Sequence, residues 1–237
     1  MVLYQLDTTR IIQVYILQGT VGFFFLFLAY KILKRDTKQL NLMLSLGYIT
    51  ASIGIFINFI YAPLTNEAIV LVLYYGTIFF MFLFCAFFLV FLLILLKSEK
   101  VFTQKKQLLL IIIYGIAELC SFFIPNGVII NASTDWKPVW SWLMFIYFVS
   151  VIVSLGLVPS LYISSKIYKQ FEDDQLKRKW KFFILGICGI YTFAIATLLS
   201  NALNIQTFRT ILSLFAFILV IISPLLIYYG VGRQIEK

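Results

Sequence analysis

Positively charged residues alternate with seven long apolar stretches along this chain. Of the 19 Lys and Arg residues, only Arg10, Lys137 and Arg209 lie outside four short basic segments. These basic segments follow the first, third, fifth and seventh apolar stretches, at residues 31–38, 97–106, 166–181 and 233–237. Lys and Arg next to a spanning helix are retained on the cytoplasmic side of a membrane. The alternation therefore predicts seven spanning helices, with the N-terminus outside and the C-terminus in the cytoplasm.

Composition favours the same class of protein. The chain is 62% hydrophobic, has a mean hydropathy of +0.99 and contains 12% charged residues. Soluble domains carry about 25% charged residues, so we expect an all-α membrane protein. A net charge of +9 in a soluble protein would indicate nucleic-acid binding. Here the basic residues are expected to anchor the helices and face anionic lipid, so the predicted partner is the bilayer, with no nucleic acid.

The apolar stretches predict one seven-helix bundle over residues 1–237, because a helix needs about 20 apolar residues to cross the hydrocarbon core. The expected spans are 11–32, 40–62, 68–96, 107–125, 140–165, 181–203 and 209–230. The longest connections, around 126–139 and 166–180, are too short to bury a core of their own. Four tryptophans lie at expected span ends, which predicts an interfacial belt with each indole N–H in the headgroup layer: Trp136, Trp140, Trp142 and Trp180.

Enzymatic chemistry finds little support in the sequence. The chain has no histidine, which excludes histidine metal sites and serine–histidine triads. There is no glycine-rich phosphate loop and no GxSxG motif. The three cysteines lie inside expected spans, where cysteine acts as a small apolar residue. The last expected span contains no Lys, which excludes a retinal Schiff base. We therefore predict a protein that is not an enzyme and has no metal and no cofactor.

One ionisable residue interrupts the apolar pattern inside an expected span. Glu118 lies in the fourth span, in its outer half. An acidic side chain at membrane depth costs at least about 2.5 kcal/mol unless it is protonated, paired or hydrated. Glu118 is accordingly a ligand contact, a proton carrier, a structural hydrogen-bond partner or a group that reaches the interface. The sequence leaves these alternatives open.

Most other polar side chains of the spans also lie in the outer half. Several helices that direct polar groups to one level are typical of a ligand pocket. With Glu118, the candidate ligand-binding residues are Gln18, Asn58, Tyr74, Tyr147, Asn201 and Arg209. Arg209 is the nearest cationic candidate to pair with Glu118. In the alternative interpretation the tyrosines are interfacial, and the amides hold helices together at about 0.6 kcal/mol each.

The expected inner loop carries a basic cluster, Lys177, Arg178 and Lys179. These residues are the candidate site for a cytoplasmic partner. Alternatively, the segment is a solvated extension of the fifth and sixth spans with i,i+4 charge pairs.

Residues 136–232 carry four motifs in a familiar order. Trp-Lys-Pro-Val-Trp-Ser-Trp at 136–142 leads to Tyr-Phe-Val-Ser at 147–150, and the basic segment 175–180 opens the sixth span. The seventh span ends in Tyr-Tyr-Gly-Val-Gly-Arg at 228–233. The region resembles the seven-helix membrane sensor module that precedes many prokaryotic histidine kinases. Those kinases continue into a signalling helix and a catalytic domain, so the resemblance implies a stand-alone sensor without catalytic residues.

These features predict a receptor-like sensor that binds an unknown small ligand in an outward-facing pocket and signals through a cytoplasmic protein. Two alternatives remain: a small proton- or ion-coupled transporter that uses Glu118, and a non-catalytic structural subunit of a membrane complex. The high content of Phe, Ile, Tyr and Lys is typical of an AT-rich genome, so we expect a prokaryotic cell membrane.

Overall fold

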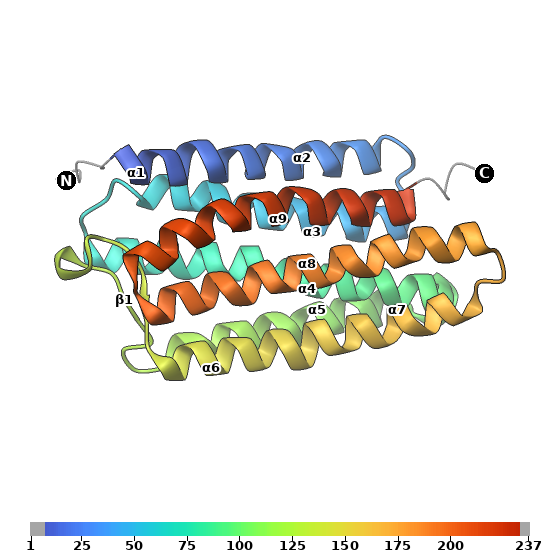
Figure 1. The fold of residues 1–237 in the computed structure, drawn as a ribbon. Coiled ribbons are helices and arrows are strands. Elements are labelled where there is room, and N and C mark those ends of the chain that lie inside the picture. The colour runs from blue at the N-terminus through green and yellow to red at the C-terminus, as the bar shows by residue number, and fades with distance from the viewer. Residues whose placement is uncertain (1–7, 233–237) are drawn as a thin grey trace.

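Seven long helices pack side by side along their lengths (Figure 1). The computed structural model describes residues 8–232, so the basic segment at 233–237 lies outside the described residues. Each of the seven helices is long and apolar enough to cross a membrane. Their bounds are Thr8–Leu33, Gln39–Tyr61, Glu67–Val101, Gln104–Phe123, Trp142–Gln170, Asp174–Leu203 and Gln206–Val231. The all-α prediction with seven membrane-length helices is thereby confirmed.

Three spans are single α-helices, namely α3 (Gln39–Tyr61), α8 (Asp174–Leu203) and α9 (Gln206–Gly232). The third span, α4 (Glu67–Val101), is kinked near its end at Ser98, whose φ is 65°. The first span is composite: α1 (Thr8–Ile11), a π-helical segment η1 (Ile12–Gln18) and α2 (Gly19–Leu33). The fourth span joins α5 (Gln104–Leu119) to a 3₁₀ turn η2 (Cys120–Phe123). The fifth contains α6 (Trp142–Val151), a π-helical segment η4 (Ile152–Leu157) and α7 (Val158–Gln170). π-Helical segments are frequent at functional sites.

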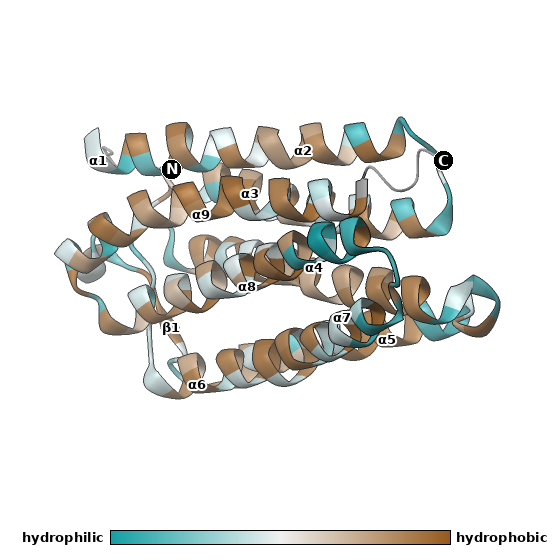
Figure 2. Ribbon diagram, turned by 45° about the vertical axis from the view of Figure 1, so that its right-hand side comes forward, coloured by the Kyte–Doolittle hydropathy of each residue, from teal (hydrophilic) through white to brown (hydrophobic). Residues whose placement is uncertain are grey.

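The two ends of the bundle differ. One end, here called the hairpin end, carries residues 124–141, in which β1 (Val128–Ile129) pairs antiparallel with β2 (Val139–Trp140). A short 3₁₀ turn, η3 (Ala132–Thr134), lies between the two strands. The opposite end, here called the basic end, carries the basic segments at 31–38, 97–106 and 166–181 and the connections at 34–38, 102–103 and 171–173. Hydrophobic residues dominate the helix middles, and the connection at 34–38 is hydrophilic (Figure 2).

The centre of the bundle is α4, whose consecutive residues Val90, Phe91 and Leu92 are completely buried. Aromatic rings fill the space between α4 and α8, where Phe88 stacks on Phe183 at 5.8 Å between ring centroids. Many large apolar side chains on other helices are exposed instead, such as Phe123 and Phe215. Apolar surface of this extent is suited to contact with lipid tails.

The tryptophan-belt prediction is wrong for three of the four residues: Trp136, at 8% exposed, is buried, and so are Trp140 and Trp180. Trp140 is 2% exposed and its indole N–H donates to the Tyr74 hydroxyl at 2.5 Å. Trp180 is 1% exposed and donates to the Ser164 carbonyl at 2.8 Å. The indoles of Trp140 and Trp180 are therefore hydrogen-bonded inside the protein, because tertiary partners satisfy the N–H without water. Trp142, at 55% exposed, fits the belt prediction.

Candidate functional site

A cavity of about 330 Å³ extends from the hairpin end toward the middle of the bundle. Side chains from five spans line it: the first span, α3, α4, α8 and α9, together with Lys137, Pro138 and Trp140 of the hairpin connection. Its volume is at the lower end of the range of about 300–1,000 Å³ for ligand pockets. The π-helical η1 contributes Gln13, Val14 and Gln18 to the lining. Spans far apart in sequence thus share one cavity.

The lining changes in character with depth. Charged and amide side chains gather near the hairpin end, among them Arg10, Gln13, Lys137, Asn201 and Arg209. The deeper lining is apolar and includes Phe25, Ile55, Ile78, Met81, Phe82, Phe193 and Phe217. A few polar groups at one end of a mostly apolar pocket are typical of sites that orient a ligand.

Five of the seven candidate ligand-binding residues lie in this cavity: Gln18, Asn58, Tyr74, Asn201 and Arg209. The Asn58 amide donates to the Gln18 side-chain oxygen and so joins α3 to the first span. The Tyr74 hydroxyl accepts hydrogen bonds from Trp140 at 2.5 Å and from Asn201 at 3.3 Å. Tyr74 therefore joins α4, β2 and α8 at the cavity wall.

The other two candidates, Glu118 and Tyr147, lie outside the cavity lining. The Tyr147 hydroxyl donates to the Ala117 carbonyl at 2.6 Å and thereby joins α6 to α5. Glu118 is 1% exposed, and neither carboxyl oxygen hydrogen-bonds to another described residue. Arg209 is not its partner, since the guanidinium of Arg209 donates to backbone carbonyls. The structure thus separates Glu118 from the residues expected to accompany it.

A second cluster of polar residues lies around Glu118, where α5 packs against α4. Tyr114 of α5 and Ser121 of η2, about one helical turn to either side, are buried, and the Ser121 hydroxyl has no hydrogen-bond partner among the described residues. The Tyr114 hydroxyl lies next to the thiol of Cys85 in α4, and Cys85 also lines the cavity. This cluster therefore lies directly behind the cavity wall. Unpartnered buried polar groups are rare in native proteins and require an explanation.

The sequence contains a signal for the cavity rim that the prediction did not use, namely the few basic residues that lie outside the four basic segments. Arg10, Lys137 and Arg209 are the basic residues outside the four basic segments, and all three line the cavity. They come from the first span, the hairpin connection and α9. A search for cations that violate the charge pattern would have identified Arg10 and Lys137 together with Arg209.

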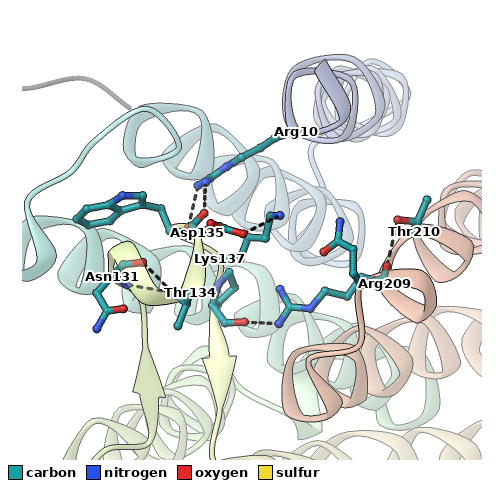
Figure 3. Close-up of polar contacts among 10 residues, drawn as sticks. Arg10, Asn131, Thr134, Asp135, Lys137, Arg209 and Thr210 are labelled. Atoms are coloured by element: carbon teal, nitrogen blue, oxygen red, sulfur yellow. Dashed lines mark hydrogen bonds and ion pairs between the residues drawn. The ribbon is translucent and has the colours of Figure 1, made fainter. Parts of the chain in front are cut away.

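Both arginines of this set bind the hairpin connection (Figure 3). Arg10 donates to the carbonyls of Asp135 at 2.8 Å and Trp136 at 2.9 Å. Arg209 donates to the carbonyl of Pro138 at 2.6 Å. Asp135 and Trp136 have positive φ angles of 50° and 55°, and this turn directs successive carbonyls toward Arg10. The connection is thereby held as part of the cavity rim.

The candidate partner-binding residues lie at the basic end. Arg178 and Lys179 line a groove between the start of α8 and the end of α9, together with Phe182 and Tyr229. Lys177 lies outside this groove and pairs with Asp174 at 3.7 Å, with Asp174 almost fully exposed. An exposed pair of this kind contributes little stability.

Comparison of the chain with known proteins supplies no relative from which to infer a role. No protein-family model, no curated protein and no solved structure matches it. Within residues 8–232, no three His, Cys, Asp or Glu side chains are grouped so that they could hold a metal ion. The function is therefore inferred from the cavity and from the charged residues on its rim.

Proposed function

We propose that this chain is a receptor-like sensor of a cell membrane that binds a small ligand in the cavity at its hairpin end. The observation that carries the proposal is the position of the cavity, which opens at the end opposite to the basic segments at 31–38, 97–106 and 166–181. By the positive-inside rule the basic end lies in the cytoplasm, so the N-terminus and the cavity face outward. A prokaryotic membrane remains the expectation from composition.

The arrangement of α8 and α9 supports a signalling role. Both helices line the cavity through residues such as Asn201 and Arg209, and both line the groove at the basic end through Arg178 and Tyr229. Pro224 lies within α9 between these two sites and removes a backbone hydrogen bond there. A ligand that shifts α9 against α8 would change the groove. Lys177, Arg178 and Lys179 then form the proposed contact with an acidic surface of a cytoplasmic signalling protein.

Thiol labelling tests the orientation and the opening of the cavity. We replace the three natural cysteines by alanine and introduce Asn201→Cys in the cavity or Gln175→Cys in the groove. A membrane-impermeant maleimide added to intact cells should label the Asn201→Cys variant and leave the Gln175→Cys variant unlabelled until the cells are permeabilised. The reverse pattern would refute the orientation. A cavity position that stays unlabelled even after permeabilisation would favour a structural subunit of a membrane complex.

A proton-coupled carrier is the second candidate, because Glu118 is a buried acid without a hydrogen-bond partner among the described residues. Intramembrane acids of this kind often belong to proton relays. The sensor proposal predicts that proteoliposomes containing the chain take up protons no faster than protein-free liposomes under a pH gradient. Proton uptake that the Glu118→Gln variant abolishes would establish the carrier instead. A pH-sensitive dye inside the liposomes provides the measurement.

A further inference from the structure

We infer that the cavity binds an amphiphilic anion. The carboxylate, phosphate or sulfate group of such a ligand lies at Arg209 and Lys137, and its hydrocarbon part fills the apolar depth. The inference rests on the proposed function, since it assigns a chemical class to the ligand of the same cavity. Three independent properties of the lining carry it: its charge, its free hydrogen-bond donors and its gradient from polar to apolar.

The charged side chains of the described lining are basic, and the Asp135 carboxylate, which pairs with Lys137, lies outside this lining. Arg10, Lys137 and Arg209 line the cavity, and no Asp or Glu occurs among the described lining residues. A cleft lined by one sign of charge between low-dielectric walls raises the local concentration of ligands of the opposite sign. The cavity therefore favours an anion over a neutral or cationic ligand.

The guanidinium of Arg209 has more N–H donors than the protein acceptors around it use. Its Nε donates to the Ser200 carbonyl at 3.3 Å, and its Nη2 donates to the carbonyls of Pro138 at 2.6 Å and Asn201 at 3.5 Å. All three acceptors are neutral, and Nη1 donates to no acceptor among residues 8–232. The carbonyls hold the guanidinium in place, while the Nη1 hydrogens remain available for a ligand oxygen. A hydrogen bond between charged partners is about twice as strong as one between neutral groups.

Lys137 supplies a second charge on the same rim. Its amine lies 3.9 Å from the Asp135 carboxylate, and the Asp135 side chain is 72% exposed. A pair at this distance with one exposed member is weak and screened by salt. Lys137 can therefore turn from Asp135 to a ligand anion at little cost. Arg10 has a different role, because its guanidinium binds the Asp135 and Trp136 carbonyls and holds the rim.

The remainder of the lining selects against a small inorganic anion. Below the rim, amides from Gln18 and Asn58 are already paired with each other. Deeper, the walls consist of apolar side chains such as Phe25, Ile78 and Phe217. A hydrated ion would leave these walls in contact with water, whereas a hydrocarbon tail removes their apolar surface from water, which is favourable. One charged end and one apolar body match the two parts of the cavity.

A matched series of three ten-carbon probes tests the inference. The full chain is placed in phosphatidylcholine nanodiscs, and its unfolding temperature is followed with added decanoate, decanol or decyltrimethylammonium. The three probes share a tail length and differ in headgroup charge. The Ala194→Phe variant fills the cavity from α8, so the difference between wild type and this variant isolates binding in the cavity. Decanoate should give the largest cavity-dependent rise and decyltrimethylammonium the smallest.

Variants at the rim then identify the anion site. Arg209→Gln should raise the decanoate concentration that gives a half-maximal response about tenfold or more, and it should leave the response to decanol unchanged. Arg209→Lys keeps the charge and should retain part of the preference for decanoate, which covers the case in which Arg209→Gln does not fold. The control is Lys105→Gln, which removes one exposed cation at the basic end and should leave every response unchanged.

The outcomes separate the inference from the proposed function. A cavity-dependent response to decanol equal to that for decanoate would overturn the anion inference and leave a ligand-binding cavity. The lack of any cavity-dependent response to all three probes would overturn both. Repeating the series in phosphatidylglycerol nanodiscs identifies the source of the ligand. A decanoate response blocked by this anionic lipid would indicate a membrane lipid in the cavity, and a persistent response would indicate a free amphiphile, each within the inferred class.

Discussion

Replacing Trp180 with alanine is expected to lower the free energy of unfolding by about 3–5 kcal/mol. The Trp180 ring is stacked on Phe183 at 4.3 Å between centroids and packs edge-on against Phe171. Its indole N–H donates to the Ser164 carbonyl of α7 at 2.8 Å. Truncation would leave a cavity where α7 meets α8 and would remove the donor to this carbonyl. Both losses act at the same place, which is why the expected effect is large.

Trp142→Ala is the matched control, because this tryptophan is 55% exposed at the hairpin end. We expect its unfolding midpoint in nanodiscs to lie near that of wild type, while the Trp180→Ala midpoint falls clearly. Denaturant unfolding followed by circular dichroism provides the measurement. Equal midpoints for the two variants would contradict the buried, hydrogen-bonded position of Trp180.

Gly186→Ala is expected to destabilise the protein by about 1–3 kcal/mol through overpacking. A methyl group at Gly186 would lie 2.6 Å from the Ser223 carbonyl oxygen and 3.1 Å from the Ile227 backbone nitrogen of α9. Because both atoms belong to the backbone, α8 and α9 would have to separate. Gly189 faces the Ser223 hydroxyl, which can rotate away, so Gly189→Ala should cost less than Gly186→Ala.

Gly76→Ala is the control for this series. At Gly76 the nearest atom to an added methyl group is the Cδ1 of Ile57 at 3.9 Å, an ordinary contact. Alanine also has the higher helix propensity, so this variant should be as stable as wild type or more stable. Unfolding midpoints of the three variants in nanodiscs provide the comparison. If Gly186→Ala matched Gly76→Ala, the close approach of α8 and α9 would be refuted.

The number and approximate limits of the helices could be predicted from sequence, because lipid imposes a length and an apolar composition on any spanning helix. The predicted fourth and sixth spans, 107–125 and 181–203, fall close to Gln104–Phe123 and within Asp174–Leu203. The largest differences in length are extensions of helices toward the basic end, where charged residues continue a helix beyond its apolar part. Hydropathy cannot detect such extensions, since a solvated helical turn is polar.

The candidate site was partly accessible from sequence. The distance of a residue from the ends of its span predicts its depth in the membrane. This depth was predicted correctly for Asn58, Tyr74 and Asn201, since all three line the cavity. The prediction could not place Glu118 and Tyr147 relative to the cavity, because that depends on how α5 and α6 are rotated in the bundle. Both helices are apolar around most of their circumference, so no amphipathic pattern defines an inner face.

The sequence by itself determined that this chain forms seven membrane-length helices, since hydrocarbon accepts only segments that satisfy their own backbone hydrogen bonds. Tertiary structure alone decided which side chains share a cavity and which are buried against other helices. It brought Arg10, Lys137 and Arg209 to one rim and turned Trp180 inward. The physical reason is that lipid tails are as apolar as a protein core. Side chains that face lipid and side chains that face protein therefore look alike in sequence, and packing distinguishes them.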